Sequence, residues 1–170
     1  MMTMSRPILL RNMTLDDVLV VVELERIIYP QPWSEVIFVD ELSRADRVYV
    51  VAEQDGAIIG YAGLMLVDVD AHVTTLGVIP ESRQAGLGTR LMVELIAAGL
   101  AMGARNLTLE VRSTNTGAQR LYERFGMAAV GVRKHYYRDD DAVIMWVTEI
   151  DEADFGQRLE TIRAALEEPS

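Results

Sequence analysis

The segment Arg83-Gln84-Ala85-Gly86-Leu87-Gly88-Thr89 places two glycines directly before an apolar pattern with helical spacing. The preceding stretch, His72–Val78, is rich in β-branched residues and is bounded by Pro80, which predicts a strand leading into the glycines. The apolar residues that recur at helical intervals are Leu87, Leu91, Leu95, Ala98 and Met102. Where glycines carry no side chain, backbone N–H groups at a helix start can approach a ligand's oxygens. This strand, turn and helix therefore predict an anion-binding site.

Two common phosphate loops do not fit this segment. A Walker loop needs a lysine after its last glycine, but Gly88 is followed by Thr89 and Arg90. A dinucleotide-binding fingerprint needs a third glycine, and Leu91 stands in its place. The remaining pattern, Arg/Gln-x-x-Gly-x-Gly/Ala, resembles the loop that binds the acetyl-CoA pyrophosphate in GNAT acetyltransferases. A tight turn with no ligand is an equally good interpretation of these residues alone.

Composition limits the classes of protein that this chain can represent. It has 170 residues, of which 50% are hydrophobic and 25% charged, so we expect one globular domain over residues 1–150 and a helical or partly disordered tail over 151–170. It contains no cysteine and two histidines, so no disulfide and no metal site are expected. A net charge of −10 argues against a nucleic-acid partner. The apolar runs are too short for a signal peptide or a membrane span, which predicts a cytoplasmic protein with no membrane partner.

Hydrophobic patterns and turn residues predict a mixed α/β chain. Strands are predicted at 7–13, 47–53, 57–67, 72–78, 106–112, 129–137 and 143–150. A capping box beginning at Thr14 predicts a first helix that ends before Pro30, and Ser34 is expected to cap a second helix to about Leu42. A third helix follows the glycines, and a fourth lies between Asn115 and Gly126. The resulting order is β-α-α-β-β-β-α-β-α-β-β around one sheet.

Three further motifs extend the resemblance. Pro32-Trp33-Ser34, Leu109-Glu110-Val111-Arg112-x-x-Asn115 with Leu121-Tyr122-Glu123, and Tyr136-Tyr137 together are similar to the ribosomal-protein-alanine N-acetyltransferase (RimI) family. The likeness runs from about residue 13 to residue 147. It implies the GNAT fold, an α/β fold with a mixed, mostly antiparallel sheet flanked by helices and splayed central strands that hold acetyl-CoA.

The same resemblance implies roles for individual residues. Glu110 is expected to act as general base and Tyr122 as general acid, with Asn115 touching the cofactor. Main-chain contacts to the pantetheine and thioester are expected from Leu76, Gly77 and Val78. The pyrophosphate is expected at Gln84, Ala85, Gly86, Leu87, Gly88 and Thr89.

The chain also departs from the family pattern. Met127 replaces the usual Phe after Gly126, Asp70 stands where Glu is common, the loop at 139–141 is short, and the tail is additional. The first change is a conservative core replacement, whereas the other three leave the substrate open.

The catalytic and substrate residues each have a structural alternative. Glu110 lies on the polar face of the strand at 106–112, where it could simply pair with Arg112 or another cation. Tyr122 could be a core aromatic, although a buried hydroxyl needs a partner and a leaving thiol could be one. Trp33 is a core anchor or the wall of a substrate pocket. Tyr136 and Tyr137 either shape a peptide entrance or pack on the sheet.

The resemblance and the candidate residues together predict an acetyl-CoA-dependent N-alpha-acetyltransferase that acts on a protein N-terminus. The resemblance implies the N-terminal alanine of a ribosomal protein as the family's substrate. An α-amine, with a pKa of about 7.7 to 8.0 against about 10.4 for lysine, is the easier amine to deprotonate. Direct transfer is expected because no cysteine can carry the acyl group. One alternative is a GNAT enzyme that modifies lysine, a polyamine or a small-molecule amine. A second is a non-catalytic module that binds acyl-CoA or a partner protein.

Overall fold

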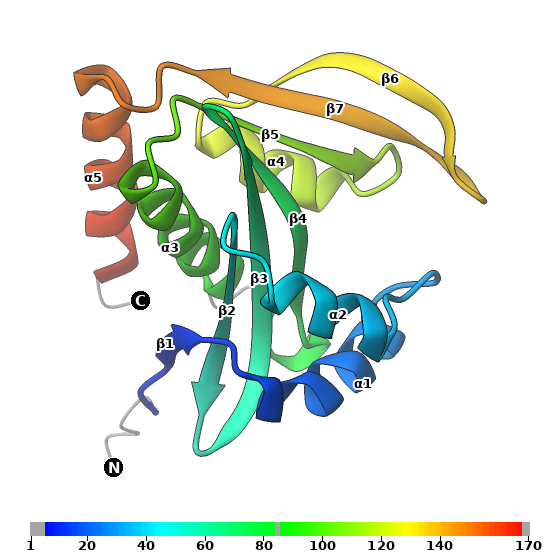
Figure 1. Cartoon of the computed structure of the whole chain (residues 1–170). Helices are drawn as coiled ribbons and strands as arrows, with labels where there is room; N and C mark the ends of the chain where they lie inside the picture. The colour runs from blue at the N-terminus through cyan, green and yellow to red at the C-terminus, as the bar shows by residue number, and fades with distance from the viewer. Residues whose placement is uncertain (1–5, 84–85, 168–170) are drawn as a thin grey trace. The chain divides into compact units, whose positions relative to one another are not determined.

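The computed structural model describes residues 6–83 and 86–167. Within these ranges seven strands form one sheet in the order β1-β2-β3-β4-β5-β7-β6 (Figure 1). The strands are β1 (Leu9–Asn12), β2 (Arg47–Gln54), β3 (Ala57–Val67), β4 (Asp70–Val78), β5 (Asn106–Arg112), β6 (Ala128–Tyr137) and β7 (Asp140–Thr148). The α-helices are α1 (Val18–Ile28), α2 (Glu35–Leu42), α3 (Leu87–Ala101), α4 (Thr116–Arg124) and α5 (Ala153–Glu167), and short 3-10 helices lie at Leu15–Asp17 and Pro80–Ser82. The predicted order of elements is confirmed.

The chain divides into two compact units. The first comprises Met1–Gly63 with Thr75–Leu95, and the second comprises Leu64–Thr74 with Ile96–Ser170. Because the boundaries fall inside β3, β4 and α3, each of these elements contributes to both units. A single domain over residues 1–150 stays a prediction.

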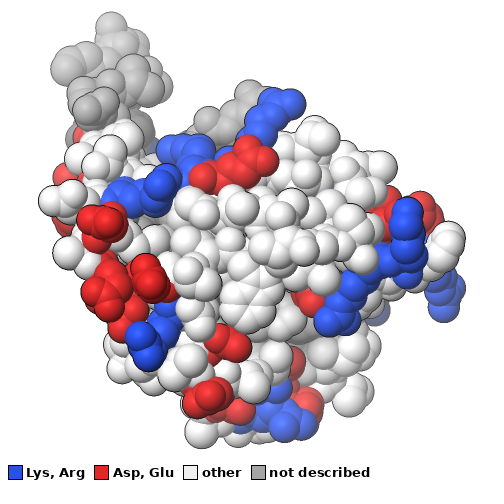
Figure 2. All heavy atoms as spheres, turned by 90° about the horizontal axis from the view of Figure 1, so that it is seen from above, with Lys and Arg blue, Asp and Glu red and all other residues white. Residues whose placement is uncertain are grey.

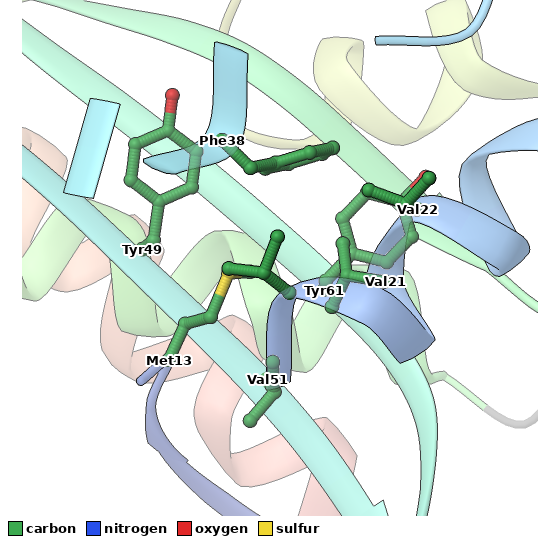
Figure 3. Packing of buried hydrophobic residues seen from close by; sticks show 8 residues of the cluster. Met13, Val21, Val22, Phe38, Tyr49, Val51 and Tyr61 are labelled. Atoms are coloured by element: carbon green, nitrogen blue, oxygen red, sulfur yellow. The ribbon is translucent and has the colours of Figure 1, made fainter. Parts of the chain in front are cut away.

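Local sequence signals account for the elements of the first unit. Thr14 and Asp17 form the predicted capping box, and the Ser34 hydroxyl accepts a hydrogen bond at the start of α2. Asp55 and Gly56 form the turn between β2 and β3 with φ angles of +53° and +79°, as the Asp-Gly pair predicts. One buried apolar cluster of this unit, drawn in Figure 3, contains Met13, Val18, Val21, Val22, Phe38, Tyr49, Val51 and Tyr61.

In the second unit β5 is paired unequally on its two sides. Its antiparallel register with β7 covers the whole strand, from Asn106↔Thr148 to Arg112↔Ala142. Its parallel register with β4 covers only three pairs, from Asp70↔Asn106 to His72↔Thr108. β5 therefore leaves its neighbour on the β4 side before Glu110 is reached, and the predicted splay of the two central strands is confirmed.

The β6–β7 hairpin is tighter than the sequence pattern suggests. β7 begins at Asp140 rather than near Val143, because Tyr137 pairs with Asp140 across a short turn. The Asp140 carboxylate also accepts hydrogen bonds from the hydroxyls of Ser113 and Thr114. These bonds connect the hairpin end to the segment between β5 and α4 and extend the strand toward the turn.

The two remaining helices of this unit follow the predicted signals. Asn115 caps α4 by accepting a hydrogen bond from the Ala118 N–H at 3.1 Å, and Gly126 ends it with a φ of +85°. α5 occupies most of the tail and buries the apolar side chains of Phe155, Leu159 and Ile162.

Charge is mixed on the face drawn in Figure 2. Lys and Arg side chains lie beside Asp and Glu side chains, separated by uncharged surface, although the whole chain carries a net charge of −10. In the part of the chain that the structure describes, every helix is too short or too polar to span a bilayer.

Candidate active site

The predicted anion site lies in the first unit, at the start of α3. Gly86 has a φ of +77°, and its carbonyl accepts the Arg90 N–H at 3.0 Å as the helix begins. Leu87 begins α3, and helix geometry leaves the first N–H groups of a helix without intrahelical acceptors. This arrangement fits an anion, while the predicted contributions of Gln84 and Ala85 lie outside the described residues.

The main chain of β4 before this turn is tightly constrained. The Tyr29 hydroxyl donates to the Leu76 carbonyl oxygen, and Arg83 Nε donates to the Val78 carbonyl oxygen at 3.2 Å. A Cβ atom on Gly77 would lie 2.5 Å from Cζ of Tyr61. Gly77 is therefore required by packing whether or not it also contacts a cofactor.

Trp33 follows α1 and is partly buried against the core of the first unit. The centre of its ring lies 5.3 Å from the centre of the Phe38 ring, and its backbone N–H donates to the Glu25 carboxylate at 3.4 Å. The structure thus shows Trp33 as a core anchor, which is one of its two predicted roles. A role in substrate binding stays a prediction.

Glu110 lies in the second unit, on β5, just beyond the last pair with β4. Its carboxylate is 2.6 Å from His72 Nε2, a distance at which the ring N–H donates, and 3.7 Å from Arg133 Nη2. The side chain is 12% exposed, so little water competes with these partners. Arg112, the neighbouring cation on the same strand face, instead contacts Asp139 at 2.5 Å.

Tyr122 lies on the buried face of α4 and is 7% exposed. Burial raises the pKa of its phenol, and the nearby Tyr137 phenol raises it further. Among the described residues the Tyr122 hydroxyl has no hydrogen-bond partner. The hydroxyl oxygen is not among the fully buried polar atoms that lack a partner, so it keeps some contact with solvent and is free to donate to a ligand atom.

Tyr136 and Tyr137 sit at an irregular part of β6. The register with β7 shifts between Arg133 and Tyr137, and His135 adopts a φ of +54°. The two tyrosine rings meet edge to face at 5.0 Å, and the Arg112 guanidinium lies 4.3 Å from the centre of the Tyr137 ring. Tyr136 is 50% exposed, so regular sheet packing does not account for it.

The structure brings the second-unit candidates together. Burial raises the pKa of Tyr137, and the nearby Tyr136 phenol and Glu110 carboxylate are among the further causes. The Tyr137 phenol also raises the pKa of Tyr122, so Tyr137 lies near enough to interact electrostatically with both Glu110 and Tyr122. Asn115 uses its side-chain carbonyl as a helix cap, so only its amide NH₂ is left for a cofactor.

Sequence reasoning missed two polar residues. The sequence places His72 only in a strand, but its Nε2 lies 2.6 Å from the Glu110 carboxylate. In the parallel β4–β5 pair His72 lies opposite Thr108, two residues before Glu110 on β5. Spacing along the chain does not reveal this register. Glu25 is 3% exposed although it falls within an ordinary helical pattern.

Comparisons with known proteins agree with this arrangement. The family model described as "Acetyltransferase (GNAT) family" matches residues 18–127. A Bacillus subtilis protein named "Putative ribosomal protein bS18-alanine N-acetyltransferase" is 42% identical over 141 residues, which cover 81% of this chain and 93% of that protein. The Mycobacterium tuberculosis protein named "N-alpha-acetyltransferase RimI" is 34% identical, covering 79% and 87%.

A solved structure shares the same fold. The ribosomal-protein-S18-alanine N-acetyltransferase from Escherichia coli superposes with a TM-score of 0.77 at 27% sequence identity. The match covers 84% of this chain and 94% of that one.

Proposed function

This chain belongs to the GNAT family of acetyltransferases, and we therefore propose that it is an N-alpha-acetyltransferase. It transfers the acetyl group of acetyl-CoA to the N-terminal amine of a protein. The proposed substrate is the N-terminal alanine of a ribosomal protein, which is supported by the names of the Bacillus subtilis and Escherichia coli relatives. A cytoplasmic location stays a prediction.

The proposal rests on two side chains of the second unit. One is a carboxylate with cationic partners, and the other is a phenol whose hydroxyl has no partner among the described residues. Glu110 is held by His72 and Arg133, whereas Tyr122 has a buried ring and a hydroxyl with no partner among the described residues. A module that only binds acyl-CoA needs neither group. Acetyl transfer needs both, because one proton must leave the amine and another must reach the thiol.

The cofactor residues are proposed from the geometry of the first unit. Gly86, Leu87, Gly88 and Thr89, with Gln84 and Ala85, would hold the pyrophosphate at the α3 N-terminus. Leu76, Gly77 and Val78 would line the pantetheine. Asn115 is proposed as a cofactor contact from the family resemblance alone. Bound there, acetyl-CoA supplies the activated thioester carbonyl.

The proposed chemistry divides the proton transfers between two residues. The amine nitrogen forms a bond to the thioester carbonyl carbon and the carbon–sulfur bond breaks. Glu110 accepts the proton that the amine releases, directly or through a water, and Tyr122 donates its proton to the departing sulfur. No residue carries the acetyl group, since the chain contains no cysteine. Trp33, Tyr136 and Tyr137 are proposed to contact the acceptor peptide.

Turnover of acetyl-CoA on matched short peptides tests the function. One peptide begins with a free alanine and contains an internal lysine, and its control differs only in a blocked N-terminus. We expect acetylation of the first nitrogen alone, located by mass spectrometry, and no turnover on the blocked peptide. Comparable modification of the lysine would instead favour a lysine or small-amine acetyltransferase.

A further inference from the structure

Glu25 on α1 is a buried carboxylate that the proposed chemistry does not use. It is 3% exposed, and among the described residues no cation pairs with it. Burial raises the pKa of its carboxyl group, and hydrogen bonds from the Tyr61 hydroxyl and the Trp33 backbone N–H act in the opposite direction. A carboxyl group costs more to bury than an apolar side chain of similar size. Its presence in the core therefore directs attention to the partner that it holds on β3, Tyr61.

Tyr61 connects this carboxylate to β4. Its side chain is fully buried in the apolar cluster of Figure 3, and its hydroxyl donates to the Glu25 carboxylate. A Cβ atom on Gly77 would lie 2.5 Å from Cζ and 2.6 Å from the hydroxyl oxygen of Tyr61, so the phenol packs directly on the Gly77 main chain. Burial raises the pKa of this phenol, and a hydrogen bond with the Thr75 side chain on β4 acts in the opposite direction. Glu25 thus fixes the end of a side chain that contacts β4.

Two further contacts hold the same stretch of β4. The Tyr29 hydroxyl donates to the Leu76 carbonyl oxygen. Gly60 precedes Tyr61 on β3, and a Cβ atom there would lie 3.2 Å from the Gly77 carbonyl oxygen. Gly77 is therefore enclosed by the β3 main chain and the Tyr61 ring. Because a close-packed interior transmits small displacements, a shift of the ring would also shift the Gly77 main chain.

This stretch of β4 is open to a ligand on its β5 side. Among the described residues the parallel register with β5 ends at His72↔Thr108, so β5 pairs with none of Leu76, Gly77 and Val78. A strand edge without a neighbour presents N–H and C=O groups that can bind an extended chain of amides. Pantetheine is a chain of this kind.

We propose that Glu25 and Tyr61 are positioning residues that set the β4 main chain at Gly77 for the pantetheine of the cofactor. The proposal rests on the cofactor site given under the proposed function, whereas the connection from Glu25 to Gly77 rests on contacts alone. Neither side chain touches a reacting atom in this scheme. Both are also separate from the Gly86 turn that would hold the pyrophosphate. Loss of the network should therefore weaken binding of the pantetheine end and spare the nucleotide end.

Three variants and one control address this role. Tyr61→Phe removes only the hydroxyl, and it tests the network if Glu25→Met fails to fold. Glu25→Met removes the acceptor at similar side-chain length, and Glu25→Gln retains an acceptor oxygen as the conservative rescue. The matched control is Asp17→Asn, because Asp17 is another buried carboxylate, 7% exposed, whose partners Arg11 and Thr14 lie outside the network.

Calorimetry with two ligands distinguishes positioning of the pantetheine from general damage. The ligands are acetyl-CoA and 3′-phosphoadenosine 5′-diphosphate, the nucleotide end of the cofactor without its pantetheine. Tyr61→Phe and Glu25→Met should raise the Kd of acetyl-CoA by about tenfold, as expected for the loss of a hydrogen bond to a charged group. The Kd of the nucleotide should stay within about twofold in every variant. Glu25→Gln should lie close to the unsubstituted protein, and Asp17→Asn should keep both Kd values.

Steady-state kinetics give a second readout. The acetyl-CoA KM should rise in Tyr61→Phe and Glu25→Met, while the peptide KM and kcat stay within about twofold of the unsubstituted protein. A fall in kcat with an unchanged acetyl-CoA KM would overturn the inference, because it would place the network in the chemical step.

The binding experiment also separates this inference from the proposed function. Unchanged acetyl-CoA affinity in a folded Tyr61→Phe variant would overturn the positioning role, and so would an equal loss of affinity for the nucleotide. Absence of acetyl-CoA binding by the unsubstituted protein would instead remove the cofactor site on which both proposals rest. Normal acetyl-CoA binding without turnover of any peptide would contradict the proposed acceptor alone.

Discussion

Glu110 and Tyr122 differ most clearly in the partners that the fold gives them. Glu110 contacts an imidazole and a guanidinium, so its orientation is set before any ligand binds. The Tyr122 hydroxyl has no partner among the described residues and keeps some contact with solvent. A substrate sulfur can therefore accept its hydrogen bond without displacing a protein partner.

Replacing Glu110 by Gln tests its proposed role as a base. The amide keeps the shape but cannot accept the amine's proton, so turnover should fall by about 10² to 10⁴. Acetyl-CoA affinity, measured by calorimetry, should stay unchanged. Glu53→Gln is the control, since Glu53 is a partly buried carboxylate that pairs with Arg11. A Glu110→Gln variant that retains most of its activity would make this carboxylate a structural one.

Replacing Tyr122 by Phe removes the proposed acid with little change in volume. Burial raises the pKa of the phenol, so the proton is present at neutral pH and is available for donation. Turnover should fall by about 10² or more, the usual lower bound for acid–base catalysis, while cofactor affinity is kept. A thioester with a more acidic leaving thiol should regain part of the loss. Equal slowing with both thioesters would contradict the leaving-group role.

At the scale of elements, the turn before α3 depends on a backbone conformation that favours glycine. Gly86 adopts a φ of +77°, and Gly86→Ala should cost about 1 kcal/mol of stability through strain. It should also weaken acetyl-CoA binding by about tenfold or more, because the first-turn N–H groups shift. Gly103→Ala is the matched control, since Gly103 has a φ of +95° beyond the other end of α3 and open space around it. Equal acetyl-CoA affinity in both variants, by calorimetry, would contradict a phosphate-binding turn.

The capping box at the start of α1 predicts a pH dependence of stability. Hydrogen bonds from Arg11, followed by those from Thr14, lower the pKa of Asp17 to about 2. Because the folded-state pKa is depressed below that of the unfolded chain, the stabilisation is present above pH of about 4 and is lost as pH falls toward 2. Asp17→Asn should lower the free energy of unfolding by about 1 to 2 kcal/mol at pH 7. Denaturant unfolding at pH 7 and at a pH near 2 should show that the difference in free energy of unfolding between the Asp17→Asn variant and the unsubstituted protein is smaller in acid. A difference that stays constant with pH would contradict this linkage.

For the whole molecule, the buried apolar side chains of α5 predict that the C-terminal tail contributes to stability. Leu159 on α5 is 6% exposed, and truncating a buried leucine costs about 2 to 5 kcal/mol. Leu159→Ala should therefore lower Tm by several degrees, whereas Gln157→Ala, at an exposed position of the same helix, should leave it unchanged. Thermal unfolding of both variants decides the point. Equal Tm values would mean that α5 is dispensable for stability.

Much of the fold could be predicted because its signals are local. Thr14, Ser34 and Asn115 start helices through bonds to residues within one turn, and the Asp55-Gly56 pair turns the chain by its own φ angles. Such signals depend on a few neighbouring residues, so the sequence alone fixes the order of elements. The family motifs likewise contain their residues in short runs, which is why Glu110 and Tyr122 could be named as candidates.

Tertiary structure alone decided which polar groups meet. Glu110 lies beside His72, and Glu25 beside Tyr61, across 38 and 36 residues of sequence. The first contact follows from strand order and register, because parallel pairing of β4 with β5 brings His72 alongside the Glu110 face while β7 occupies the other edge. The second follows from the packing of α1 against Tyr61 in one buried cluster. Arg112, which the sequence places beside Glu110, reaches Asp139 on the β6–β7 turn instead. Side-chain partners across a sheet depend on which strands are neighbours, and that information is not contained in the spacing along any one strand.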